Sequence, residues 1–259
     1  YIKDCFLDII IMEEKMRKDI VKILPLGGQA EMGKSMYCIE IKDKIFILDA
    51  GFRFPEINKL GIDIIIPSFD YLKENASRVV AIIITHGHDD VMGALPYLLE
   101  AVNAPIYAPA LTADLIDQML KRHKKHNNFK INYQLNRVKR NDSIEIEGVP
   151  VEFFPVTHSI PGSVGVALWT RDGYIVYCGE FIIDFGAPEG FRCDIQKMME
   201  IGKKGVLALL CESSYSKNSG YTSPKHKLTD KIDNIFEDSE GRIIISSYAQ
   251  NIFRTKEMS

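Results

Sequence analysis

A short run of histidines and aspartates follows directly on an apolar, strand-like segment, and it constrains the fold more than any other part of the sequence. The segment covers residues 79–85, and the letters HGHDD follow it at residues 86–90. Two imidazoles two positions apart, with a carboxylate two residues further on, can converge where a strand ends in a tight turn, and the glycine between them gives the backbone room for it. Imidazole nitrogens and carboxylate oxygens bind zinc and similar divalent ions. The sequence therefore predicts a metal site that includes His86, His88 and Asp90.

The composition is that of an ordinary globular protein. The chain has 259 residues, 46% of them hydrophobic and 26% charged, so it can bury a full core. The net charge of −3 argues neither for nor against a nucleic-acid partner. No apolar run approaches the roughly 20 residues that a membrane span needs, so we expect no contact with a membrane. The five cysteines show no C-x-x-C spacing, which favours reduced thiols and a cytoplasmic location.

Hydrophobic patterns predict an α/β fold in which packed sheets are flanked by helices. The predicted strands cover residues 21–26, 37–41, 44–48, 62–66, 79–85, 105–108, 143–154, 164–170, 174–178, 206–210 and 242–247, and the predicted helices cover residues 70–78, 93–102 and 112–121. Within residues 143–154 the apolar side chains alternate, which predicts that one face of that segment points into the core.

Three more candidate site residues stand just after predicted strands. They are His158, Glu180 and Asp49. Taken singly, each is also typical of a turn or a helix cap. His158 is a candidate third imidazole beside His86 and His88.

Several segments give the chain a specific resemblance. The letters THGHDD at residues 85–90 resemble the T-H-x-H-x-D-H signature of the metallo-β-lactamase superfamily. Other segments narrow the resemblance to the ribonuclease J family: LPLGG at 24–28, GKSMY at 33–37, GIDIIIP at 61–67, GALPY at 93–97, THSIP at 157–161, and GRII at 241–244 with NI at 251–252. This resemblance implies an αβ/βα sandwich into which a second domain, called β-CASP, is inserted.

The resemblance also implies a role for each candidate residue. One metal ion would be held by His86, His88 and His158. A second would use Asp90, a histidine directly after it and a histidine from beyond the end of this chain, and an aspartate at the position of Glu180 would bridge the two ions. Asp49 would orient one of the ligands.

Two residues depart from the family pattern. Val91 stands where the histidine after Asp90 is expected, and Glu180 is one methylene longer than the bridging aspartate. Both departures weaken the second metal site, because two-metal hydrolases need two ions about 3.5–4 Å apart. We therefore expect one Zn²⁺ rather than two, with Mn²⁺ and Mg²⁺ as alternatives. The pattern resembles the degenerate second paralogue of ribonuclease J, which implies weak or lost activity.

The resemblance divides the chain into three parts. Residues 1–19 would be an N-terminal extension, residues 20–208 the first part of the metallo-β-lactamase domain, and residues 209–259 the start of the β-CASP domain. In that last part the candidate RNA-binding residues are Glu212, Ser246, Asn251 and Arg254, and Phe253 stands where a histidine is usual. The later β-CASP motifs are absent, so we expect a fragment or a truncated product without the whole active site.

These observations support one leading hypothesis and one rival. The leading hypothesis is a metal-dependent ribonuclease, exonucleolytic or endonucleolytic, that acts on single-stranded RNA in processing and decay, with His88 and Asp90 as catalytic residues. Asp90 would orient or deprotonate the attacking water. The rival is a non-catalytic subunit that binds RNA or an active paralogue, in a homo-oligomer or a hetero-oligomer. A small-molecule metallohydrolase is a weaker third reading, which Glu212 disfavours.

Overall fold

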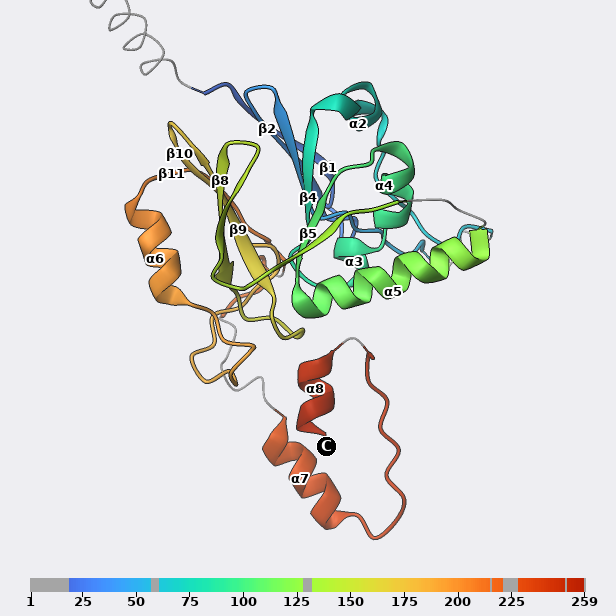
Figure 1. Cartoon of the computed structure of the whole chain (residues 1–259). Helices are drawn as coiled ribbons and strands as arrows, with labels where there is room; N and C mark the ends of the chain where they lie inside the picture. Colours follow the sequence, from blue (N-terminus) through green and yellow to red (C-terminus); the bar gives the residue numbers. More distant parts are fainter. Residues whose placement is uncertain are drawn as a thin grey trace, which may run out of the picture.

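Two β-sheets packed face to face form the centre of the molecule in a computed structural model of the chain (Figure 1). The structure describes residues 19–56, 61–127, 132–214, 216–220, 228–249 and 251–258, with the side chains of residues 126 and 127 excepted. The predicted N-terminal extension therefore lies outside the described residues, apart from residue 19.

The first sheet has six strands in sequential order. They are β1 (Val21–Gly27), β2 (Met36–Ile41), β3 (Lys44–Leu48), β4 (Val79–Ile83), β5 (Ile106–Pro109) and β6 (Leu135–Val138). Strands β1 to β3 form an antiparallel meander, with β2 and β3 joined as a tight hairpin. Strands β3 to β6 are parallel, so their carboxyl ends lie at the same edge of the sheet.

The second sheet has five strands in the order β11-β10-β9-β8-β7. They are β7 (Ser143–Ile146), β8 (Val149–Pro155), β9 (Val164–Thr170), β10 (Gly173–Tyr177) and β11 (Val206–Leu210). Neighbours pair antiparallel except β10 and β11, which are parallel. Strands β8, β10 and β11 therefore also end at one edge.

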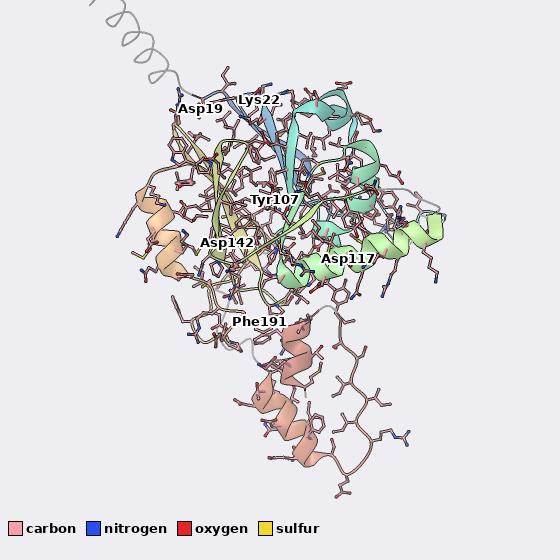
Figure 2. The ribbon with its side chains drawn as sticks, in the orientation of Figure 1. Asp19, Lys22, Tyr107, Asp117, Asp142 and Phe191 are labelled. Atoms are coloured by element: carbon pink, nitrogen blue, oxygen red, sulfur yellow. The ribbon has the colours of Figure 1, made fainter. Side chains whose placement is uncertain are left out.

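Helices cover the outer faces of both sheets (Figure 1). The first sheet carries α2 (Asp70–Glu74), a 3₁₀ turn (Ala76–Arg78), α3 (Asp89–Met92), α4 (Leu95–Ala101) and α5 (Ala110–Asn127), and the second carries α6 (Ile195–Lys203). Helices α7 (Thr229–Asp238) and α8 (Ile252–Glu257) lie beyond one end of the sandwich. Phe191, labelled in Figure 2, contacts Phe253 of α8 with ring centroids 5.3 Å apart.

Alternation along the strands separates the core into layers. In β3, Ile45 and Ile47 pack under the helices, whereas Phe46 and Leu48 pack between the two sheets. Successive strand residues point to opposite faces, so a strand buried on both faces must be apolar throughout. The strand predicted over residues 143–154 is instead the antiparallel hairpin of β7 and β8, but its predicted inward face is confirmed, because its apolar side chains join the core between the sheets.

Two predicted strands are wrong. Residues 62–66 make only an isolated bridge, between Arg53 and Ile65. Residues 242–247 form no strand, and Ile244 is 87% exposed. Both segments contain runs of isoleucine, but a strand also needs a continuous neighbouring strand, and in the described part of the chain neither segment has one. In contrast, β6 and the helices α3, α6, α7 and α8 form without having been predicted, and α5 extends six residues beyond the predicted end.

A buried ionic cluster attaches α6 to the second sheet and gives a prediction for acid stability. Glu152 is 5% exposed and accepts hydrogen bonds from Lys197 (2.5 Å), Lys204 (2.7 Å) and Tyr174 (2.5 Å). Burial raises the pKa of Glu152, but these hydrogen bonds outweigh burial and lower it from 4.5 to about 2. A pKa lowered by folding stabilises the folded state above the unfolded-state pKa, and the stabilisation disappears as the pH falls through the folded-state pKa.

We expect Glu152→Gln to reduce the free energy of unfolding by about 2–3 kcal/mol at pH 7. The difference from the wild type should vanish between pH 4.5 and about 2. Urea unfolding at a series of pH values measures it. Glu145→Gln, at an exposed position of β7 in the same sheet, is the control and should change stability by less than about 0.5 kcal/mol. A pH-independent difference would contradict the assignment.

Candidate metal centre

The candidate residues meet where the carboxyl ends of the two sheets come together. Asp49 follows β3, His86 follows β4, His158 follows β8, and Glu180 follows β10. The sheets are joined here by two hydrogen bonds, from the Val164 nitrogen to the Thr85 oxygen (3.2 Å) and from the Tyr177 hydroxyl to Asp49 Oδ2 (2.6 Å). Residues up to 131 positions apart are therefore brought to one place by the directions of the strands and the packing of the two sheets.

Three imidazoles and one carboxylate form a compact group. Ligand atoms of His86, His88, His158 and Glu180 all lie within 4.8 Å of one another. His88 Nδ1 is 3.2 Å from His86 Nε2 and 3.0 Å from His158 Nε2, and His158 Nε2 is 3.8 Å from Glu180 Oε2. The three rings meet edge to face.

A chain of hydrogen bonds orients His86. The Thr85 nitrogen and hydroxyl both donate to Asp49, over 2.8 and 3.1 Å. Because the Thr85 hydroxyl donates its own hydrogen to Asp49, it accepts a hydrogen bond from His86 Nδ1, over 3.0 Å. This network assigns the proton to Nδ1 and leaves the lone pair of Nε2 facing the group. Asp49 thus contacts His86 through Thr85, a residue that the sequence analysis missed although it belongs to the THGHDD segment.

The other two rings are held by their own neighbours. His88 Nε2 lies 3.3 Å from the Ser159 hydroxyl, which leaves Nδ1 for the group. Burial, together with the neighbouring His88 ring, lowers the pKa of His158 to about 3. Burial likewise lowers the pKa of His86 well below its usual value. Both rings are therefore neutral at pH 7, which is the state in which imidazole binds a metal.

The pKa values of the carboxyl groups of Glu180 and Asp49 are shifted in the opposite direction, upward. Burial raises the pKa of Glu180 to about 8, and the neighbouring carboxylates of Asp90, Glu212 and Asp49 add to it. Burial also raises the pKa of Asp49 to about 7, against hydrogen bonds from Tyr177 and Thr85 that lower it. A site where carboxylates resist ionisation in each other's presence is one that a cation stabilises.

These donors fit a divalent metal such as zinc. Nitrogen ligands about 2.0–2.1 Å from a tetrahedral zinc ion stand about 3.3–3.4 Å from one another. The distances of 3.0 and 3.2 Å between the imidazole nitrogens approach that value. His86, His88 and His158 would hold the ion, with Glu180 beside it.

Asp90 and Val91 lie on the short helix α3 next to this group. Asp90 is not among the ligand group found in the described residues, but it shares a hydrogen bond with Glu180. Val91 is 1% exposed and packs in the core under the helices. The side chain after Asp90 therefore supplies no ligand atom for a metal.

Close backbone contacts fix the position of α3. The Asp90 oxygen accepts from the Ser35 nitrogen (3.0 Å), and the Val91 oxygen accepts from the Ala50 nitrogen (2.7 Å). A Cβ atom at Gly51 would lie 1.5 Å from the Asp90 oxygen. At Gly87 φ is not positive, so its role is not the turn itself: a Cβ atom there would lie 2.4 Å from Leu115 of α5.

The predicted RNA-binding residues do not all lie together. Glu212 follows β11 and accepts from the Phe181 nitrogen at 3.0 Å, next to Glu180. Ser246 is exposed on the extended segment before α8. Asn251 caps α8 by accepting from the Arg254 nitrogen at 2.9 Å, and Arg254 pairs with Glu257.

The segment around α8 nevertheless reaches the metal group. The Phe253 nitrogen donates to the Ser159 oxygen at 3.1 Å, one residue from His158. Burial, then the carboxylates of Asp89 and Asp90, raises the pKa of Tyr248, whose side chain is 61% exposed.

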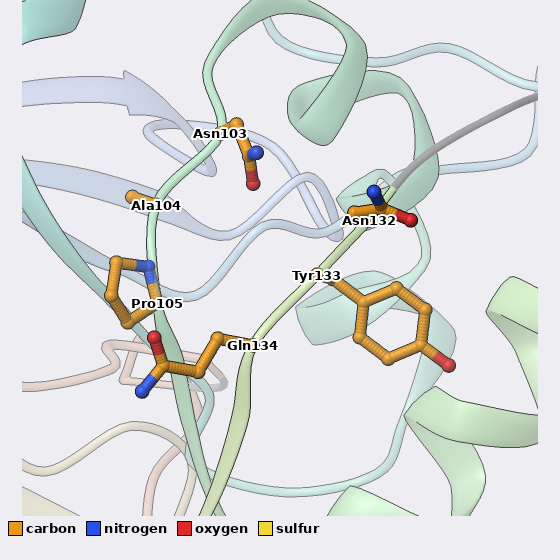
Figure 3. A pocket seen from close by; sticks show the side chains of 6 residues that line it. All are labelled: Asn103, Ala104, Pro105, Asn132, Tyr133 and Gln134. Atoms are coloured by element: carbon orange, nitrogen blue, oxygen red, sulfur yellow. The ribbon is translucent and has the colours of Figure 1, made fainter.

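A hollow lies at the end of the first sheet that is opposite to the metal group. It has a volume of about 360 Å³ and is lined by Asn103, Ala104, Pro105, Asn132, Tyr133 and Gln134 (Figure 3). Pro105 precedes β5 and Gln134 precedes β6, so this hollow is at the amino ends of the parallel strands. It has no part in the metal group.

A match to a known family agrees with this geometry. Residues 31–194, more than half of the chain, match the family described as the metallo-beta-lactamase superfamily. The chain belongs to the metallo-β-lactamase superfamily. The predicted sandwich fold is thereby confirmed, and its two sheets with outer helices are those of Figure 1.

The sequence is most informative when it is compared with individual proteins of the superfamily. The chain is 40% identical over 241 residues to Ribonuclease J 2 of Streptococcus pyogenes serotype M3, covering 92% of this chain and 42% of that protein. It is 40% identical over 246 residues to Ribonuclease J 2 of Staphylococcus aureus strain NCTC 8325, covering 95% and 43%. The resemblance to the ribonuclease J family is confirmed, and the chain spans about two fifths of the length of these relatives.

A solved structure shows the same fold. A protein of unknown function from Enterococcus faecalis V583 superposes with a TM-score of 0.64 at 16% identity, over 92% of this chain and 62% of that one. In the described residues no helix is both long and apolar enough to cross a membrane.

Proposed function

We propose that this metallo-β-lactamase chain takes part in metal-dependent hydrolysis of single-stranded RNA, as a ribonuclease J-type protein of RNA processing and decay in the cytoplasm. The observation that carries the proposal is the convergence of His86, His88 and His158 with Glu180 at the meeting edge of two sheets. The named relatives supply the substrate class. Cleavage from the 5′ end and internal cleavage are both compatible with this site.

The chain's own residues have distinct parts in the proposed reaction. His86, His88 and His158 would hold a divalent ion, which would supply Lewis acidity at the scissile phosphodiester. Asp90 and Glu180 share a hydrogen bond, and this carboxyl pair is the group that orients the attacking water and takes up its proton. Asp49, through Thr85, keeps His86 in the tautomer that faces the site.

Val91 favours a second candidate function, that of a weakly active or non-catalytic subunit. The buried Val91 has no lone pair, so we propose one bound ion rather than two. In that role the protein would bind RNA or a catalytically complete paralogue, as a homo-oligomer or a hetero-oligomer. Residues 209–259 would contribute to RNA binding through Glu212, Ser246, Asn251 and Arg254.

Metal analysis and RNA cleavage on the purified protein test the proposal. We expect about one zinc ion per chain and slow, metal-dependent cleavage of a 5′-labelled single-stranded RNA that a chelator abolishes. Zinc without cleavage, together with RNA binding or co-purification of a paralogue, would favour the subunit. Failure to bind Zn²⁺, Mn²⁺ or Mg²⁺ would overturn the enzyme proposal.

A gain of function is expected from Val91→His combined with Glu180→Asp. The double change introduces the imidazole after Asp90 and the shorter carboxylate that the family pattern has at these positions. Bound zinc should therefore rise above one ion per chain, and the rate of RNA cleavage should increase at least about tenfold. Zinc content and initial cleavage rate measure it. Val91→Leu with Glu180→Asp is the matched control, since it fills the buried position without a donor. Equal zinc content in both double variants would count against the role given to Val91.

A further inference from the structure

Two cysteines directly follow neighbouring strands of the second sheet, outside the metal group. Strands β10 and β11 are parallel, and Tyr177 pairs with Leu210 in their register. The next residue on each strand is a cysteine, Cys178 and Cys211, and the Cys178 nitrogen donates to the Leu210 oxygen at 3.0 Å. The two cysteines therefore occupy adjacent positions, at a strand spacing of about 4.7–4.9 Å.

Their side chains face the same space. Both line a hollow of about 340 Å³ between α6 and the sheet. Cys178 is 3% exposed, whereas Cys211 is exposed. Burial, followed by the adjoining Cys211 thiol, which is also its hydrogen-bond partner, raises the pKa of Cys178 to about 12. One thiol is thus open to reagents in solution, and the second lies directly behind it.

We propose that Cys178 and Cys211 are a modification site that forms a reversible disulfide. Neighbouring strand positions fall within the Cα separation of about 4.4–6.8 Å that disulfides require. Exposed disulfides of this kind are the labile ones, in contrast to buried structural ones. Among the described cysteines, Cys38 and Cys193 are buried at other positions and do not share this hollow.

The oxidant is a low-molecular-weight disulfide such as oxidised glutathione. The Cys211 sulfur attacks one glutathione sulfur, and the first glutathione leaves as a thiol with the proton that Cys211 gave up. The Cys178 sulfur then attacks the Cys211 sulfur, the mixed disulfide breaks, and the second glutathione leaves with the proton from Cys178. The protein loses two hydrogen atoms, and one glutathione disulfide becomes two thiols.

The bond would act on the turns that follow the two strands. Glu180 stands two residues after Cys178, and Glu212 directly follows Cys211. The Phe181 nitrogen already donates to Glu212 Oε1 at 3.0 Å across these turns. A disulfide would fix the spacing of the two strand ends, and a thiol reductant would release it.

Peptide mapping tests the proposal without reference to activity. The full chain is treated with oxidised glutathione, its free thiols are alkylated, and it is cut with trypsin without reduction. Trypsin places Cys178 alone in residues 172–192 and Cys211 alone in residues 205–217. We expect these two peptides to appear as a linked pair that dithiothreitol separates.

Variants make the result specific. Cys211→Ser should abolish the linked pair, and Cys178→Ala should leave a stable glutathione adduct on Cys211. Cys193→Ala should form the linked pair as the wild type does. The proposal is overturned if wild-type Cys211 only accumulates glutathione, or if it pairs with another cysteine, Cys5 included. Cys211 is exposed, so its serine variant tests the bond even if Cys178→Ala fails to fold.

Discussion

His88→Gln is expected to remove zinc binding and, with it, RNA cleavage. His88 Nδ1 lies 3.2 Å from His86 Nε2 and 3.0 Å from His158 Nε2, so it is the nitrogen that both other imidazoles face. Loss of a residue that only supports a ligand weakens metal binding 10–100-fold. Loss of the central ligand should exceed this, with zinc affinity reduced more than about 100-fold. Calorimetric titration with zinc and metal content after dialysis measure the change.

The fold should survive this substitution. His88 precedes α3 as its N-cap residue, but its side chain makes no capping hydrogen bond, so the helix does not depend on the imidazole. His123→Gln is the matched control: His123 lies on α5 against Tyr97 and Glu100, away from the metal group. It should keep the zinc affinity of the wild type. A folded His88→Gln protein with wild-type zinc affinity would show that the imidazoles are not the metal ligands.

Much of the fold could be predicted because it depends on patterns within single segments. The apolar run of β3 is buried on both faces, and the tight hairpin with β2 follows from its short polar turn. Hydrophobic patterns did not predict the strands correctly where pairing with a neighbouring strand decides whether a segment becomes a strand. Residues 242–247 contain three consecutive isoleucines but have no neighbouring strand among the described residues, whereas the polar β6 is a strand because β5 pairs with it.

The candidate site also has a part that could be predicted from the sequence and a part that could not. His86, His88, His158 and Glu180 could be selected because each follows a strand and has metal-binding chemistry, and the structure brings them together. The parts that hold them could not be selected. Thr85 links Asp49 to His86 through a hydroxyl orientation, which depends on contacts across the two sheets and not on spacing in the sequence.

Gly51→Ala is expected to destabilise the protein strongly, because it places an atom where the backbone of α3 already lies. The new Cβ would be 1.5 Å from the Asp90 oxygen and 2.8 Å from the Val91 nitrogen. Neither contact can be relieved by rotating a side chain, so α3 or the loop after β3 must move. We expect a loss of about 3–5 kcal/mol in the free energy of unfolding. Denaturant unfolding at pH 7 measures it.

Gly202→Ala separates this steric effect from the general effect of replacing a glycine. Gly202 lies in α6, and nothing is within 4 Å of the added Cβ. Alanine there should leave stability unchanged or raise it by about 0.5–1 kcal/mol, since alanine favours helix. A residual folded fraction of Gly51→Ala should also bind zinc more weakly, because the displaced α3 begins directly after His88. Wild-type stability in Gly51→Ala would mean that the loop after β3 and α3 do not touch. It would then also contradict the placement of Asp90 beside Glu180, because that placement depends on the same contact.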